Sequence, residues 1–192
     1  MPRRPRWSAA GAAALVSLSL LSLLSGACAS SQRPPMPPPG TICEPLEPRT
    51  PTCDYALAIS LGLQAHAHPA SARDKLAQMV VLLRRAAAAD PTLDRAGPHR
   101  VLALVLLRAP GWPRGPGDPE EGLVVARRAV ALAPDYAPNQ LALAEGLALN
   151  QQPGPAREAA KRALPLAEAA VADGVADASE WLREAKDRST RE

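Results

Sequence analysis

Residues 126–136 read Ala-Arg-Arg-Ala-Val-Ala-Leu-Ala-Pro-Asp-Tyr, and related copies of this stretch lie on either side of it. The earlier copy is Leu-Arg-Arg-Ala-Ala-Ala-Ala-Asp-Pro at residues 83–91, and the later copy is Ala-Lys-Arg-Ala-Leu-Pro at residues 160–165. Separations of 43 and 34 residues lie between the second basic residues of the three copies, Arg85, Arg128 and Arg162. A period of about 34 residues, with one copy lengthened by an insertion, is typical of stacked helix pairs. We therefore expect an all-α fold.

The residues inside this period resemble the tetratricopeptide repeat (TPR), a family whose repeats are two antiparallel helices with large and small apolar residues at fixed positions. The clearest copy supplies the apolar set Leu143, Ala144, Leu147, Ala156, Ala160 and Ala163. The copy before it supplies Leu102, Ala103, Leu106, Gly122, Ala126, Ala129 and Pro134. The resemblance implies an antiparallel helix-pair solenoid of about three repeats, closed by a C-terminal capping helix.

We expect the helical domain to span residues 54–188. Ser71 followed by Asp74 resembles a capping box, and Pro91 ends the helix that this box would open. Gly97-Pro98 opens the next helix, because a proline at the first helical position loses no hydrogen bond. An insertion at residues 109–118 follows, and Asp118 and Pro119 then suit the capped first turn of a fourth helix. Further helices are expected at residues 55–66, 139–149, 156–172 and 176–188.

The net charge of +3 comes from the extreme N-terminus, where Arg3, Arg4 and Arg6 lie. Without these three arginines the chain has 19 basic and 19 acidic residues. A nearly neutral domain lacks the basic surface that nucleic-acid binding requires. We therefore expect no nucleic-acid partner.

Residues 1–28 resemble a bacterial lipoprotein signal peptide. The three arginines are followed by an apolar stretch at residues 9–24 and by small residues that end at Cys28. We expect Cys28 to carry the lipid, palmitate included, that anchors the chain to a membrane. Ordinary secretion, with Ala27-Cys28-Ala29 as the cleavage signal, is the alternative. No Asp-type retention signal follows Cys28, so resemblance to well-studied bacterial systems implies the outer membrane, facing the periplasm.

Residues 29–53 are expected to form a tether between anchor and domain. They include Arg-Pro-Pro-Met-Pro-Pro-Pro-Gly at residues 33–40, a composition that favours extended polyproline II. Cys43 and Cys53 remain as an even pair in an oxidising compartment, which predicts a disulfide between them. Two free thiols are the alternative.

The sequence contains no catalytic constellation, no Gly-rich phosphate loop and no metal-ligand spacing. His66 and His68 lie two residues apart, so on a helix their side chains point in different directions. We therefore expect a protein that is not an enzyme and that uses no cofactor and no metal.

The TPR resemblance implies a binding surface on the inner side of the array. First-helix positions would line an apolar trough with one cation and one anion, suited to an extended peptide or an amphiphile; they are Arg100, Leu104, Leu107, Leu141, Glu145 and Leu149. The alternative is that the leucines are core residues and that Arg100 pairs with Glu145. His99, Trp112 and Asn139 complete the candidate surface, with helix capping and loop packing as their alternative roles.

A narrower resemblance covers about residues 80–165. Ala-Gly-Pro-His-Arg at residues 96–100, the insertion ending at Asp118, and Leu-Ala-Pro-Asp-Tyr-Ala-Pro-Asn at residues 132–139 look like the T component, a TPR lipoprotein associated with tripartite ATP-independent periplasmic (TRAP) transporters. This resemblance implies a periplasmic protein, able to form homo-oligomers, that docks a substrate-binding protein and passes it a small apolar ligand. The first expected function is therefore a lipid-anchored TPR adaptor that mediates protein–protein interaction, and the second is a TRAP-associated accessory protein.

Overall fold

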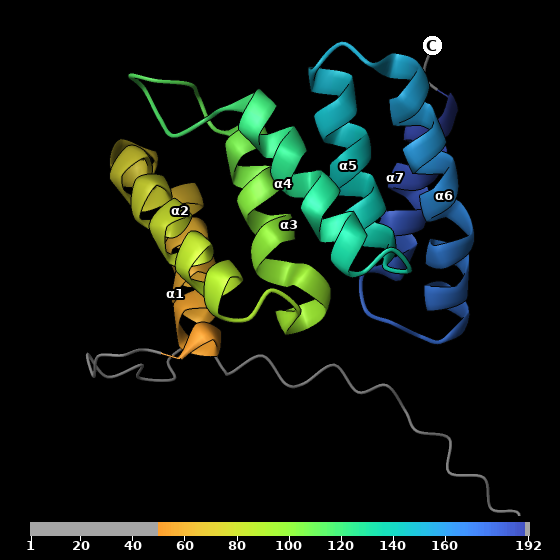
Figure 1. The fold of residues 1–192 in the computed structure, drawn as a ribbon, viewed down its shortest axis with the longest axis horizontal. Helices are drawn as coiled ribbons and strands as arrows, with labels where there is room; N and C mark the ends of the chain where they lie inside the picture. Colours follow the sequence, from red (N-terminus) through yellow and green to blue (C-terminus); the bar gives the residue numbers. More distant parts are fainter. Residues whose placement is uncertain (1–49, 191–192) are drawn as a thin grey trace, which may run out of the picture. The chain divides into compact units, whose positions relative to one another are not determined.

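The structure, a computed structural model, describes residues 50–190, and this part of the chain is all-helical as predicted (Figure 1). A single 3-10 turn, η1 (Pro69–Ser71), precedes the second helix. Between residues 50 and 190 there is no strand, only an isolated β-bridge between Gly111 and Gly117. The helices are α1 (Pro51–Ala67), α2 (Ala72–Ala89), α3 (Leu93–Arg108), α4 (Pro119–Leu132), α5 (Ala137–Leu149), α6 (Pro153–Ala172) and α7 (Ala178–Thr190).

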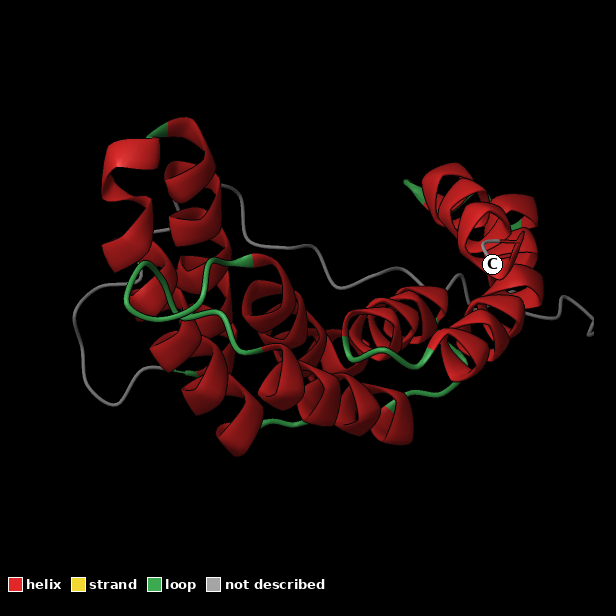
Figure 2. Ribbon diagram, turned by 90° about the horizontal axis from the view of Figure 1, so that it is seen from above, coloured by secondary structure: helices red, strands yellow, loops and turns green. Residues whose placement is uncertain are grey.

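The helices pack as successive pairs. α1 packs on α2, α3 on α4, and α5 on α6, and α7 closes the array against α6. The first helices of successive pairs also touch, because α3 contacts both α1 and α5 and α5 contacts α7. We call α1, α3, α5 and α7 the inner row. Three helix pairs plus a closing helix confirm the predicted helix-pair solenoid, and the connections lie at the helix ends (Figure 2).

Small residues let the helices approach closely, as the apolar pattern predicts. Every large or small apolar residue that the two repeat copies placed in the core, from Leu102 to Ala163, is buried, apart from Pro134, which is exposed. A Cβ atom on Gly122 would lie 2.8 Å from Leu107 Cγ, and one on Gly146 would lie 3.3 Å from Leu123 Cα. A chain without phenylalanine therefore builds its core from leucine and alanine at short interhelical distances.

Helix starts agree with the sequence in one case and differ in another. Asp118 caps α4 as predicted, because its carboxylate accepts a hydrogen bond from the Glu121 backbone N–H at 3.0 Å. The capping box at Ser71 does not form. Ser71 ends the 3-10 turn that Pro69 opens, and its hydroxyl donates back to the His68 carbonyl at 3.2 Å instead.

Several predictions concern residues beyond the described range. The signal peptide at residues 1–28, the lipidated Cys28 and most of the tether at residues 29–53 lie outside it. Cys53, in the first turn of α1, is disulfide-bonded, and its predicted partner Cys43 also lies outside the described residues. Within residues 50–190, no helix is long and apolar enough to cross a membrane.

Candidate functional site

The first turn of α3 has an unusual backbone. Asp94, Arg95 and Ala96 adopt left-handed φ values of 48°, 53° and 63°. Each such residue costs free energy because its Cβ crowds the following carbonyl, so three in succession require support from their surroundings. Gly97 follows, and a Cβ there would lie 2.6 Å from the Tyr55 hydroxyl oxygen. The sequence therefore needs glycine at this point to let α1 and α3 meet.

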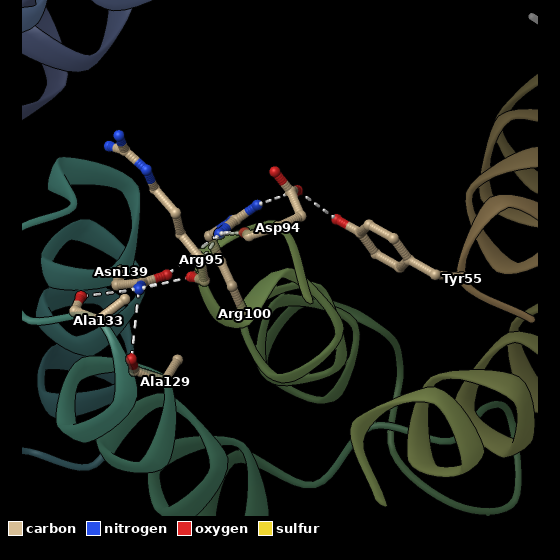
Figure 3. Close-up of polar contacts among 7 residues, drawn as sticks. All are labelled: Tyr55, Asp94, Arg95, Arg100, Ala129, Ala133 and Asn139. Carbon is tan, nitrogen blue, oxygen red and sulfur yellow. Dashed lines mark hydrogen bonds and ion pairs between the residues drawn. The ribbon is translucent and has the colours of Figure 1, made fainter. Parts of the chain in front are cut away.

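Asn139, at the start of α5, supplies much of that support. Its side chain is fully buried, and its Nδ2 group donates to the carbonyls of Arg95 (3.1 Å), Ala133 (3.0 Å) and Ala129 (3.2 Å). Its Oδ1 atom accepts from Arg100 Nη1 at 3.2 Å. One amide thus joins α3, α4 and α5 at the left-handed turn (Figure 3).

Arg100 and Tyr55 hold the same turn from two other directions. The Arg100 guanidinium lies 3.0 Å from Asp94 Oδ2 and reaches the carbonyls of Asp94 and Arg95 at 3.4 Å. The Tyr55 hydroxyl, from α1, donates to Asp94 Oδ2 at 3.0 Å (Figure 3). Burial, together with this hydrogen bond, raises the pKa of the Tyr55 phenol above its ordinary value. The phenol therefore remains a donor at neutral pH.

Tyr136 brings two arginines and a tryptophan to one ring. The guanidinium carbons of Arg95 and Arg100 lie 5.1 Å and 5.0 Å from the ring centroid, within cation–π distance. Trp181 of α7 meets the ring edge-on, with centroids 5.6 Å apart. Arg95 is exposed, and among residues 50–190 no carboxylate lies within ion-pair distance of its guanidinium. A cation is therefore held in place at the surface without a counter-charge from this part of the chain.

A second polar cluster joins the other end of the inner row. Arg108 of α3 contacts both carboxylate oxygens of Glu145, at 2.8 Å and 2.6 Å, and Arg188 of α7 approaches the same carboxylate at 3.0 Å. Arg188 also pairs with Glu184 at 2.7 Å. Burial alone would raise the pKa of Glu145, but the hydrogen bonds and charges of Arg108 and Arg188 outweigh it and hold this pKa below its ordinary value. This cluster is internally neutralised, so its arginines do not offer a free charge.

The structure separates the predicted surface residues rather than gathering them in one trough. Leu107 packs against Gly122, and Leu141 is buried with Ala163 and Ala185. Both leucines are core residues, because Leu107 of α3 is covered by α4 and α5 at Gly122 and Gly146, and Leu141 of α5 is covered by α6 and α7, so they cannot line a surface. Leu104 is partly buried and Leu149 is half exposed.

The polar members of the predicted surface lie in three places. Arg100 and Asn139 bind the left-handed turn, and Glu145 is in the second cluster. Arg100 therefore pairs with Asp94, and Glu145 pairs with Arg108 and Arg188, so the alternative Arg100–Glu145 pair does not form. His99 is half-buried beside the Pro91 carbonyl, and burial together with the Arg128 charge lowers its pKa. Trp112 is on the insertion loop and is 88% exposed.

Sequence reasoning did not identify five residues that contact Arg100, Asn139 or one another around the left-handed turn: Tyr55, Asp94, Arg95, Tyr136 and Trp181. A signal was available, because Tyr136 lies in the stretch that identified the repeat and Gly97-Pro98 marks the junction. The backbone conformation of residues 94–96 had no such signal, since none of them is glycine. In the described part of the chain no group of three or more His, Cys, Asp or Glu side chains could hold a metal ion.

Neither a scan against protein-family models nor a search of curated proteins gave a match for this chain.

Proposed function

We propose that this protein is a non-enzymatic, TPR-like adaptor, anchored by a lipid on Cys28 to the periplasmic face of the bacterial outer membrane, that binds a protein partner through the inner row. The proposal combines the lipoprotein-like N-terminus with the helix-pair fold. Helical arrays of this kind offer an extended surface to a partner without any catalytic group.

One observation carries the binding part of the proposal: the Arg95 guanidinium is exposed, lies over the Tyr136 ring and has no carboxylate partner in the described residues. Its backbone carbonyl is bonded to Asn139 and Arg100, and its head group lies over Tyr136. Ordering a long side chain on binding normally costs affinity, and packing of the guanidinium over the Tyr136 ring lowers that cost. The network around it is the kind of support that a binding side chain needs.

The chemistry of Arg95 favours an acidic group on the partner. A guanidinium presents N–H donors that match the two oxygens of a carboxylate, in a charge-assisted and bidentate arrangement. Asp94 does not compete for Arg95, because its Oδ2 atom accepts from both Arg100 and Tyr55. We infer that the partner places an Asp or Glu side chain, or a C-terminal carboxylate, against Arg95.

The TRAP-associated role is the second proposal, and it predicts a different partner. Its apolar trough loses Leu107 and Leu141, which are core residues. What supports it is the resemblance of residues 80–165, together with an inner row that could dock a folded substrate-binding protein.

A cross-linking pull-down from native membranes tests both proposals, with the full-length protein as bait and mass spectrometry of captured proteins and small molecules. The Arg95→Glu variant should lose the specific partner, whereas Arg127→Glu, the same charge change at an exposed site on α4, should keep it. Recovery of a solute-binding protein with a small ligand would favour the TRAP role. Equal capture by both variants would refute a role for Arg95.

The anchor is tested separately by membrane fractionation. Cys28→Ser should move the protein from the outer-membrane fraction to the soluble fraction and abolish labelling by a palmitate analogue. If the wild-type protein is already soluble and unlabelled, ordinary secretion is the correct alternative and the anchoring part of the proposal fails.

A further inference from the structure

The insertion between α3 and α4, residues 109–118, is a closed and internally bonded loop. Gly117 N–H donates to the Pro110 carbonyl at 2.9 Å, and Arg114 N–H donates to the Gly111 carbonyl at 3.0 Å. The base of the loop is fixed to the helix before it, because Asp118 N–H donates to the Leu106 carbonyl at 2.8 Å. The loop therefore has a defined shape that presents its tip away from the helices (Figure 1).

Two glycines make this closed shape possible. A Cβ on Gly115 would lie 2.6 Å from the Pro110 carbonyl oxygen. A Cβ on Gly117 would collide with the Ala109 carbonyl oxygen. Only glycine permits such a close approach of two backbone segments. The two glycines thus allow the loop to adopt this one closed conformation.

The loop displays Trp112, the most exposed large hydrophobic side chain in the described part of the chain, at 88%. A tryptophan side chain is more stable when its ring is buried than when it is in water. An exposed Trp112 on a loop of defined shape therefore indicates a contact with something outside this domain. Arg114, two residues on, is the single charged residue between positions 109 and 117.

Two more exposed apolar side chains lie toward the same edge of the array. α1, α3 and α5 run in one direction, so their C-terminal ends lie together (Figure 1). Leu63, near the end of α1, is 67% exposed, and Leu149, the last residue of α5, is 50% exposed. The end of α5 is tied to the loop base, since Asn150 donates to the Pro119 carbonyl at 2.8 Å.

We propose that Trp112 inserts into the headgroup region of a lipid bilayer, with Arg114 against lipid phosphate, and that this loop sets how the tethered domain lies on its membrane. Tryptophan favours the bilayer interface because its ring is apolar and its indole N–H is polar, and a cation beside it is attracted to anionic lipid. The loop composition of tryptophan, prolines and one arginine matches that interface.

This inference rests on the proposed anchoring at Cys28, because a tether makes a weak contact effective. One inserted ring binds weakly by itself, but a tether holds it at a high local concentration near the membrane. With the predicted Cys43–Cys53 disulfide formed, residues 28–43 could reach about 45 Å if extended, against about 25 Å for the length of α1. The loop edge can therefore meet the membrane although the tether joins α1 at its opposite end.

The test uses full-length protein reconstituted into vesicles of phosphatidylcholine and phosphatidylglycerol that contain lipids brominated near the headgroup. We expect bromine to quench a tryptophan signal that disappears in Trp112→Ala. Val171→Ala, at an exposed apolar side chain near the end of α6 and on the opposite edge of the array, is the control and should leave the quenching unchanged. Arg114→Gln should weaken the interaction about fivefold on anionic vesicles, and less on neutral ones.

Two outcomes overturn the inference. If the protein floats with the vesicles but Trp112 is quenched by aqueous acrylamide and not by brominated lipid, the loop faces water or another protein. If the protein does not float, the anchoring proposal has failed, and the same quenching is measured with brominated vesicles added at saturating lipid concentration. Absence of Trp112-dependent quenching there also refutes membrane insertion.

Discussion

Asn139 donates a hydrogen bond to the Arg95 carbonyl at 3.1 Å, and this contact fixes an exposed arginine from a fully buried amide 44 residues away. It links the start of α5 to the left-handed turn at the start of α3. The backbone position from which the Arg95 side chain reaches the surface is therefore decided inside the core. Changes at the buried end of this contact should affect both the stability of the fold and the geometry of the candidate site.

Replacing Asn139 with alanine should destabilise the fold by about 2–4 kcal/mol, because the carbonyls of Arg95, Ala129 and Ala133, in buried or partly buried positions, lose their shared donor. The measurement is urea unfolding followed by circular dichroism. Asn150→Ala is the matched control, and it should cost about 1 kcal/mol or less because the Asn150 side chain lies near the surface. Equal costs for the two variants would contradict the central role of Asn139.

Replacing Gly97 with alanine should destabilise the fold by about 1–3 kcal/mol, because the new methyl group meets the Tyr55 hydroxyl and the Asp94 side chain. Gly154 in the first turn of α6 gives the opposite expectation, since a Cβ there has no heavy atom within 4 Å. Gly154→Ala should stabilise the fold by up to about 1 kcal/mol through lower entropy of the unfolded chain. Thermal unfolding of both variants separates crowding from the backbone effect, and a neutral Gly97→Ala would show that Tyr55 can move aside.

Glu145 should make the fold sensitive to acid. Its pKa is held below the ordinary glutamate value in the folded protein, so the folded state favours the ionised form. Its stabilising contribution is therefore present above the unfolded-state pKa and is lost as the pH falls through the lower, folded-state pKa.

Urea midpoints measured from pH 7 down to pH 3 test this expectation for Glu145. Glu145→Gln should be less stable than the wild type at neutral pH and should show a shallower loss toward acid. Glu168→Gln, at an exposed site on α6, should follow the wild-type curve. If Glu145→Gln keeps the full wild-type slope, other carboxylates govern the acid response.

Trp181 should be the main attachment of α7 to the array. It packs against the cluster of Leu141, Ala163 and Ala185 and meets Tyr136 edge-on. Trp181→Ala should cost about 3–5 kcal/mol through the lost packing and ring contact, and Trp181→Phe should recover much of that loss. Hydrogen exchange should locate the change in α7 first, because this last helix packs against only two other helices, α5 and α6. Uniform loosening of every helix would instead indicate a fully cooperative array.

The predictions made from sequence succeeded where the information is local. Pro91 and Pro134, the Asp118 cap and the small residues on helix faces each act within a few turns of chain, so the helices and their buried faces could be predicted. The Ser71 cap failed because Pro69 starts a 3-10 turn just before it, and the two signals compete for the same residues.

The candidate site could be predicted only in part. Arg100 and Asn139 were identified as surface residues, but the structure places them with Asp94, Arg95 and Tyr55 in a network that crosses two helix junctions. Leu107 and Leu141 were assigned to a trough because the repeat register puts them on inner helices, yet the neighbouring helices cover both side chains and bury them. Trp112 was grouped with these residues, although it lies on a separate loop.

The sequence by itself determined that the chain forms antiparallel helix pairs with alanine-lined interfaces, because helix periodicity and helix breakers act over short distances. Only the tertiary structure decided which charges find partners. Tyr55 and Asp94, Arg100 and Asn139, and Arg108 and Glu145 are 37 to 39 residues apart, close to one repeat, and they meet because successive first helices lie side by side. The rotation and offset of one helix against the next set these contacts, and they depend on the packing of the whole array. That packing gives Arg100, Arg108 and Glu145 their partners and leaves Arg95 exposed, with no carboxylate partner among residues 50–190.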